Sequence, residues 1–284
     1  MKAGPAGERL AFKILRLAAL LAIVLTPVAL VCVEYVYPFL SSLGSSLRYK
    51  GELSLYNYQY ALGVYGGDIA FTIYVSLLSL ILVMLIAVLA GGWMIVKGGG
   101  VIEFIFKIPL FIPFVVVGHA MRTFLAPKGL LNSMLSQIGL VDLSSPPNLI
   151  YGALGIVISL AWKQTAFALV LVMAAYRSVD RSYLEAARNF GASTWRQITG
   201  ILLPLSKGSV GAASVLIFSS FLQNFSTVMM MGNPGGRKHI MVDIYHIINY
   251  LNDLPLANAL GVISYLLALG SAVLYLREGM RKNA

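Results

Sequence analysis

The sequence EAARNFGASTWRQITGILLP occupies residues 185–204 and separates two long apolar stretches. Its pattern consists of an acid followed by two alanines, a glycine four residues later, and then two aliphatic residues and a proline. These residues are Glu185, Ala186, Ala187, Gly191, Ile201, Leu203 and Pro204. A polar, basic segment between two apolar stretches is typical of a loop that connects two membrane spans. This loop therefore fixes where the chain leaves the membrane and re-enters it.

Composition indicates an integral membrane protein. Hydrophobic residues make up 58% of the chain and charged residues only 11%, with a mean hydropathy of +0.82, whereas about 25% of residues are charged in soluble proteins. Each of six apolar stretches is close to the roughly 20 residues that a helix needs to cross a bilayer. They are Leu17–Val33, Ile69–Gly92, Val101–Met121, Leu149–Ala175, Ser209–Met231 and Leu254–Leu276. We predict an all-α membrane protein with six spans and the 185–204 loop between the fourth and fifth.

The charge distribution orients these spans. If the N-terminus is cytoplasmic, the inner segments carry a net charge of +9 and the outer segments a net charge of 0. An excess of Lys and Arg on the cytoplasmic side is typical of membrane proteins. We therefore predict a multi-pass inner (plasma) membrane protein with both termini and the 185–204 loop in the cytoplasm, and the net charge of +10 does not indicate nucleic-acid binding.

The first apolar stretch resembles a signal peptide, but its uncharged core is 17 residues long and no small-x-small cleavage site follows. We therefore expect it to be retained as a helix. Residues 34–68 are expected to form a polar outer loop. In the third span, Pro109 and Pro113 predict a kink, since each removes a backbone donor. Between the third and fourth spans, the apolar face of residues 130–138 predicts a short interfacial helix.

The 185–204 loop contains its own helix signals. Ser182, followed three residues later by Glu185, forms a capping box and predicts a helix that begins near Tyr183. Gly191 suits the left-handed conformation that ends a helix. A weaker capping signal at 194–197 predicts a second short helix, and Pro204 fits the first turn of the fifth span.

This spacing resembles the EAA loop of permease subunits in binding-protein-dependent type I ABC importers. The resemblance covers about residues 69–277 of a single permease domain, 1–284, in which residues 1–68 supply the first helix and outer loop. It implies two ATP-binding-cassette ATPase subunits, a second permease and an extracytoplasmic solute-binding protein as partners. The short helix would seat in a groove of the ATPase, with Glu185, Ala186, Ala187 and Gly191 at the contact. An amphipathic loop that lies on the inner leaflet is the alternative.

Motifs for catalysis by this chain are lacking in the sequence. It contains no Gly-x-x-x-x-Gly-Lys-Ser/Thr loop, no His-Glu-x-x-His metal motif and no nucleophile elbow. We expect no cofactor on this chain, with ATP and Mg²⁺ held by the partner subunits, and no enzymatic activity of its own.

Candidate residues for the translocation path are polar groups within spans. Lys163 lies in the fourth span, where a charge is costly, and either serves the path or forms a structural pair. A polar stripe in the fifth span offers hydrogen bonds to a solute or to a neighbouring helix; it comprises Ser219, Ser220, Gln223, Asn224 and Thr227. His119 in the kinked third span is a further candidate, for which satisfied packing is the alternative.

The solute is less well defined. The sequence from Phe221 to Pro234 resembles the polyamine, ferric-iron, thiamine or phosphonate branch of the family, and most closely the first permease of a spermidine/putrescine system. The alternative function is a stand-alone ion-coupled secondary transporter, which typically shows inverted repeats and buried acids; every acid except Glu103 is predicted at or outside a span end. A scaffold or receptor subunit without transport is a third possibility.

Overall fold

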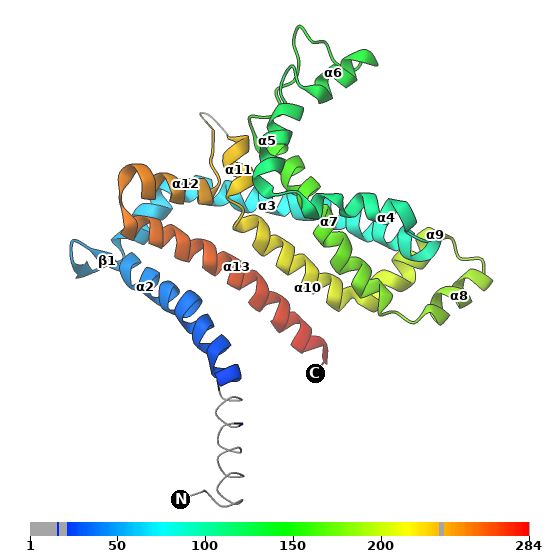
Figure 1. Ribbon diagram of the computed structural model, residues 1–284, viewed down its shortest axis with the longest axis horizontal. Helices are drawn as coiled ribbons and strands as arrows, with labels where there is room; N and C mark the ends of the chain where they lie inside the picture. The colour runs from blue at the N-terminus through cyan, green and yellow to red at the C-terminus, as the bar shows by residue number, and fades with distance from the viewer. Residues whose placement is uncertain (1–15, 17–21, 233–235, 284) are drawn as a thin grey trace, which may run out of the picture.

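Helices form almost all of the computed structural model, which describes residues 16, 22–232 and 236–283 (Figure 1). Within this part of the chain, five helices are long and apolar enough to cross a membrane, and one bent helix pair makes a sixth span if it is counted once. The five are Ala22–Ser46, Tyr56–Lys97, Ala153–Arg177, Thr194–Leu222 and Leu254–Arg277. The predicted all-α membrane fold is confirmed, although residues 17–21 of the first predicted span and the predicted cytoplasmic N-terminus, 1–15, lie outside the described residues.

The first span and its outer connection differ from the prediction. The helix does not end at Val33 but continues through a π-helical turn, η1 (Cys32–Val36), into α2 (Tyr37–Ser46). Glu34, predicted to follow the span, therefore lies within it. The apolar sequence that follows Glu34 carries the helix onward, and Pro38 is tolerated in the first turn of α2.

Helices occupy most of the predicted outer loop, 34–68, and a small hairpin joins them. Its strands are β1 (Arg48–Tyr49) and β2 (Glu52–Leu53), which pair antiparallel. The next helix, α3 (Tyr56–Lys97), begins directly afterwards and is 42 residues long. At 1.5 Å per residue it spans about 63 Å, roughly twice the thickness of a bilayer core, so it extends beyond the span predicted from Ile69 to Gly92.

The centre of the bundle is α7 (Ala153–Arg177), which packs along α3. In its most apolar window 72% of residues are buried, against 28% for α3. Leu160, Val172 and Tyr176 of α7 are almost fully buried in the main hydrophobic cluster. A helix that is covered all round in this way positions the elements on both of its sides.

The third span is broken, as its two prolines predict. It consists of α4 (Gly100–Lys107), a 3₁₀ turn η2 (Ile108–Phe111) and α5 (Phe114–Phe124), and the two halves meet at 104°. Pro113 adopts an extended ψ of 145° at the break. The predicted kink is therefore confirmed and amounts to a change of direction.

The fifth span is displaced relative to the prediction of Ser209–Met231. It runs from α9 (Thr194–Gln197) through the π-helical turn η3 (Ile198–Leu202) into α10 (Leu203–Leu222). Pro204 therefore lies inside a continuous helix. The amide of Leu203 bonds to the carbonyl of Ile198, five residues back, and this wider turn accommodates the missing donor of the proline.

The remaining elements are short connecting helices and the last span. α6 (Leu130–Gln137) projects beyond the end of α5 and confirms the predicted short helix (Figure 1). Its Asn132 is fully buried and donates hydrogen bonds to the carbonyls of Ala126, Pro127 and Pro147. Three helices complete the chain after α10: α11 (Ser226–Met231), α12 (Ile240–His246) with its π-helical continuation η4 (Ile247–Leu251), and α13 (Leu254–Asn283).

Candidate functional site

The helix predicted at the start of the 185–204 loop is present as α8 (Arg181–Asn189). Its N-cap is Asp180, whose carboxylate accepts a hydrogen bond from the amide of Ser182 at 2.9 Å. That bond from the Ser182 amide lowers the pKa of Asp180 below its ordinary value. The predicted N-cap, Ser182, is therefore wrong by two residues, because two capping residues stand close together and the acid takes the position.

Gly191 ends this helix in the predicted left-handed conformation, with φ of +75°. The amide of Gly191 bonds to the carbonyl of Arg188, and the amide of Ala192 bonds to that of Ala187, both at 2.9 Å. These bonds close the C-terminal end of α8. The next helix, α9, is capped by Ser193, whose hydroxyl accepts from the amide of Arg196, one residue before the predicted Thr194.

The α8 segment is attached to the bundle on one side. Leu184 is buried, and the guanidinium of Arg188 donates to the carbonyl of Val96 at the end of α3, at 3.3 Å. Glu185 lines a cavity of about 610 Å³ between α8 and the ends of α3 and α7. Ile201 and Leu203 pack against the main core, whereas Pro204 is exposed. These contacts fix how α8 stands on the bundle.

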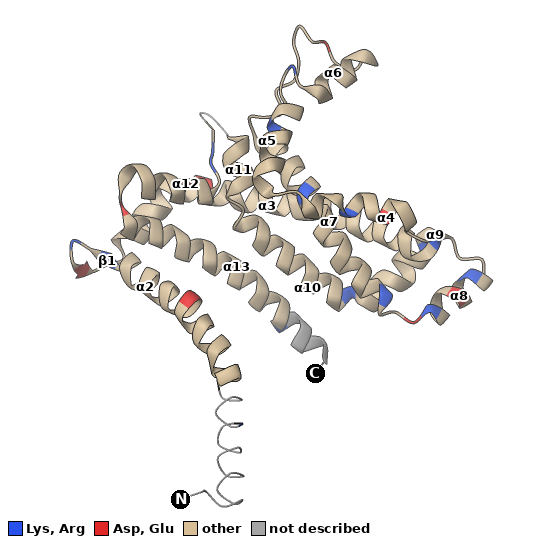
Figure 2. Cartoon of the chain, viewed as in Figure 1, with Lys and Arg blue, Asp and Glu red and all other residues tan. Residues whose placement is uncertain are grey.

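The stretch from α8 to α9 also carries aromatic residues that are exposed in the part of the chain that the structure describes. Phe190 is 92% exposed, Trp195 61% and Tyr183 56%. Ala186 is exposed beside them and Ala187 is half-buried. Basic residues also gather around α8 and α9 (Figure 2). These aromatic residues were not predicted as part of the site; their signal in the sequence was large apolar side chains within a polar loop.

A polar pocket brings together most of the stripe predicted on the fifth span. The pocket has a volume of about 470 Å³ and lies between α5, the end of α10 and the start of α11. It is lined by Phe114, Leu216, Ser219, Ser220, Gln223, Asn224, Phe225 and Ser226. Four of the five predicted residues thus share one cavity with two aromatic rings.

The stripe was predicted to lie on one helix. It does not, because α10 ends at Leu222. Gln223 and Asn224 lie in the break that follows, and the side-chain oxygen of Asn224 accepts from the amide of Thr227 at 3.1 Å. Thr227 itself is buried and donates to the carbonyl of Phe114 at 3.4 Å. It therefore joins α11 to α5 and is not among the residues that line the pocket.

Lys163 lies next to this pocket, at the break of the third span. It is 6% exposed, and its ammonium group donates to the carbonyls of Pro109 at 2.6 Å and Leu110 at 3.3 Å. The same group lies 4.8 Å from the centre of the Phe114 ring. His119 is different: it lies on an exposed part of α5 and is not among the residues that line the pocket.

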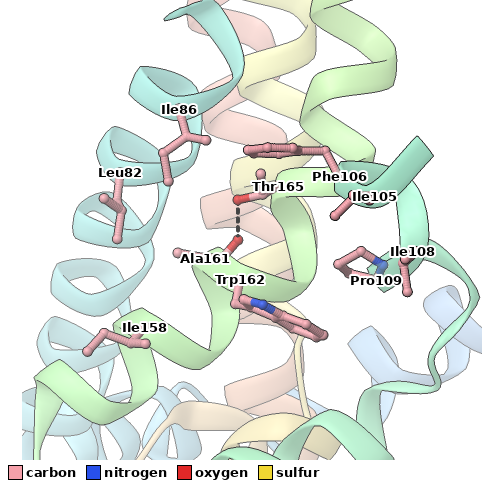
Figure 3. Close-up of a pocket in the computed structure, with 10 residues that line it drawn as sticks. All are labelled: Leu82, Ile86, Ile105, Phe106, Ile108, Pro109, Ile158, Ala161, Trp162 and Thr165. Carbon is pink, nitrogen blue, oxygen red and sulfur yellow. Dashed lines mark hydrogen bonds between the residues drawn. The ribbon is translucent and has the colours of Figure 1, made fainter. Parts of the chain in front are cut away.

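A further cavity, of about 520 Å³ and with an apolar lining, opens between α3, the α4–η2 segment and α7 (Figure 3). In that view Leu82 and Ile86 face Ile105 and Phe106 across the cavity, and Trp162 also lines it. The hydroxyl of Thr165 is used by a bond to the carbonyl of Ala161, at 2.7 Å. This lining suits apolar groups, and a polar solute would find few partners in it.

The arrangement defines a helical membrane subunit with a capped, protruding loop at one end. The sequence pattern of the family described as "Binding-protein-dependent transport system inner membrane component" matches residues 84–277, which is more than half of the chain. The chain therefore belongs to this family.

Permeases named for different solutes have similar sequence identities to this chain. The trehalose/maltose permease MalF of Thermococcus litoralis is 28% identical over 187 residues, covering 64% of this chain and 63% of MalF. The spermidine/putrescine permease PotB of Haemophilus influenzae is 29% identical, and the match covers 44% of this chain and 42% of PotB. The sulfoquinovosyl glycerol permease SmoG of Agrobacterium fabrum is 30% identical, and the match covers 52% of this chain and 49% of SmoG. The match therefore spans between about two fifths and two thirds of the length of these relatives.

A solved structure extends the likeness over nearly the whole chain. A chain of a bacterial ABC transporter involved in the import of the acidic polysaccharide alginate superposes with a TM-score of 0.78 at 22% identity. The superposition covers 96% of this chain and 99% of that chain. The fold is therefore that of an ABC importer membrane subunit, including the elements outside residues 84–277.

Proposed function

We propose that this chain is one of two permease subunits of an ABC importer and couples to an ATPase subunit through α8. The observation that carries the proposal is the two-sided structure of α8. Arg188 bonds to the end of α3 and Glu185 faces the cavity toward α7, while Phe190, Trp195 and Tyr183 are exposed on the loop. Exposed aromatic residues are enriched where proteins dock. A docked subunit would therefore act on the bundle through a rigid contact.

The energy source in this proposal lies in the partners. Two ATPase subunits would hold ATP and Mg²⁺, and their closure on ATP binding would move α8 and the helices to which it is attached. A structure of the alginate transporter includes its periplasmic protein with an alginate pentasaccharide bound. By analogy, we propose that an extracytoplasmic binding protein delivers the solute here, with both termini and α8 on the cytoplasmic side.

We propose that the polar pocket forms part of the translocation path. Its serine, glutamine and asparagine side chains offer donors and acceptors, and Phe114 and Phe225 offer ring faces. His119 and Thr227 remain weaker candidates because neither lines the pocket. A polyamine is one candidate solute, by the likeness to PotB, and a sugar is another, by the likeness to MalF and SmoG.

The test is ATPase activity of the reconstituted complex with its binding protein. We expect Glu185→Arg to abolish most of the stimulation by binding protein, because it places a positive charge beside Arg177 and Arg188 in the cavity through which α8 adjoins the bundle. Glu52→Arg, on the exposed β2 strand, is the matched control and should leave the stimulation unchanged. Full stimulation in Glu185→Arg, with normal assembly, would show that α8 is not the coupling element; a chain that assembles with no ATPase subunit would favour the ion-coupled secondary transporter instead.

A further inference from the structure

The break of the third span removes the α-helical bonds of its backbone carbonyls. Pro113 has no amide, so the carbonyl of Pro109 lacks its usual partner four residues ahead and accepts instead from the amide of Ile112, at 3.3 Å. Leu110 lies in the same 3₁₀ turn, which ends at Phe111, before the 104° bend. Lys163 supplies donors to both carbonyls. Within a bilayer, freed backbone groups persist only where something else satisfies them, and here an ammonium group contributes.

This ammonium group is held without an acid. No carboxylate forms an ion pair with Lys163 in the part of the chain that the structure describes. Its charge is instead met by two carbonyl oxygens and by the face of the Phe114 ring at 4.8 Å. Dipoles of this kind leave the net positive charge in place, and the field of a charge reaches further in a low-dielectric medium than in water.

The ammonium group lies next to the polar pocket and is not itself among the residues that line it. Phe114 contacts the Lys163 ammonium group and also lines the pocket. The neighbouring residue, Gln164, donates a hydrogen bond to Ser220, which lines the pocket from α10. All the residues that line this pocket are uncharged, so no carboxylate there opposes the charge of Lys163.

We propose that Lys163 is a specificity-determining residue that makes the polar pocket electropositive. The pocket then admits neutral or anionic polar solutes, such as sugars or acidic sugars, and disfavours cations such as polyamines. The inference rests on the proposed function, in which the pocket belongs to the translocation path. Lys163 then has two roles: its hydrogen bonds stabilise the bend of the third span, and its charge sets the charge preference of the path.

The experiment measures the electrostatic potential of the pocket in the assembled complex. A cysteine is placed at Ser219 in a Cys32→Ser background, and its modification rates by anionic and cationic methanethiosulfonate reagents are compared. The reference position is Gln137→Cys, on the exposed side of α6. With Lys163 intact, we expect the anionic-to-cationic rate ratio to be about fivefold higher at Ser219 than at Gln137.

Substitution of Lys163 supplies the second arm. Lys163→Met should lower the ratio at Ser219 to that at Gln137, while Lys163→Arg should retain the high ratio. Equal ratios at the two positions with Lys163 intact would overturn the inference, even if Lys163→Met failed to assemble. An unchanged ratio in an assembled Lys163→Met complex would do the same. Because stimulation of the ATPase through α8 is measured separately, failure here leaves the proposed coupling untouched.

Discussion

Asp243 in α12 is a buried acid outside the candidate spans. It is 3% exposed, and its Oδ2 atom has no hydrogen-bond partner among the described residues. Burial, with a smaller contribution from Asp68, raises the pKa of Asp243 to about 7, and Lys238 opposes the shift. The acid is therefore neutral in the folded protein over a range in which an unfolded chain would ionise it.

This shift predicts a pH dependence of stability. Between pH of about 4 and 7 the unfolded state loses the proton and the folded state retains it, so the free energy of unfolding falls as pH rises. We expect Asp243→Asn to raise the melting temperature of the purified complex by an amount that is negligible near pH 4, grows to pH 7 and is constant above it. Glu52→Gln on the exposed hairpin is the control. A gain in melting temperature that is the same at every pH would refute the titration.

At the residue scale, predictions succeeded where the backbone allows few choices. Gly191 was predicted from its position after a helical pattern, and its φ of +75° agrees. The N-caps were misplaced because Asp180 and Ser182, like Ser193 and Thr194, are near neighbours that can both cap a helix. The role of Lys163 was left open, since its carbonyl partners come from a break more than 50 residues away in sequence.

At the scale of elements, α8 is closed at its C-terminal end by the geometry of Gly191. We expect Gly191→Ala to destabilise this end by about 1 kcal/mol, because a β-carbon is unfavourable at positive φ. Space around the position is open, so the cost comes from the backbone. Gly191→Asn should retain most of the stability, since Asn tolerates this conformation. Hydrogen exchange of the amides in α8 reports the difference; equal exchange in Gly191→Ala and wild type would contradict the expectation.

The existence of the spans was predictable from the sequence, but the residues at which some of them begin and end were not. Six spans and the bend at Pro109 and Pro113 followed from apolar length and missing amides. The outer end of the first span did not, because Glu34 interrupts an apolar sequence without ending the helix. The fifth span began earlier than predicted, since the π-helical turn η3 lets Pro204 sit inside it. Both places contain a π-helical turn, η1 or η3, which has no simple sequence signature.

For the whole molecule, the spans are arranged so that α7 connects two separate regions. Its middle, through Lys163 and Gln164, holds η2 and α10 beside the polar pocket. Its end, at Arg177, forms an ion pair with Glu103 of α4 at 2.9 Å and borders the cavity behind α8. A movement of α8 would therefore reach the pocket through one buried helix. The polar pocket was only partly predictable, because its lining comes from α5 as well as from the predicted stripe.

The central claim is that the exposed side of the α8 loop contacts an ATPase subunit. The most direct measurement is photo-cross-linking in the assembled complex, with benzoylphenylalanine at Phe190, which is 92% exposed. The same group at Leu53, which is 82% exposed on the β hairpin, is the control. We predict an adduct with the ATPase subunit from position 190, identified by mass spectrometry, and none from position 53. No ATPase adduct at position 190, in a complex that still assembles, would contradict the account.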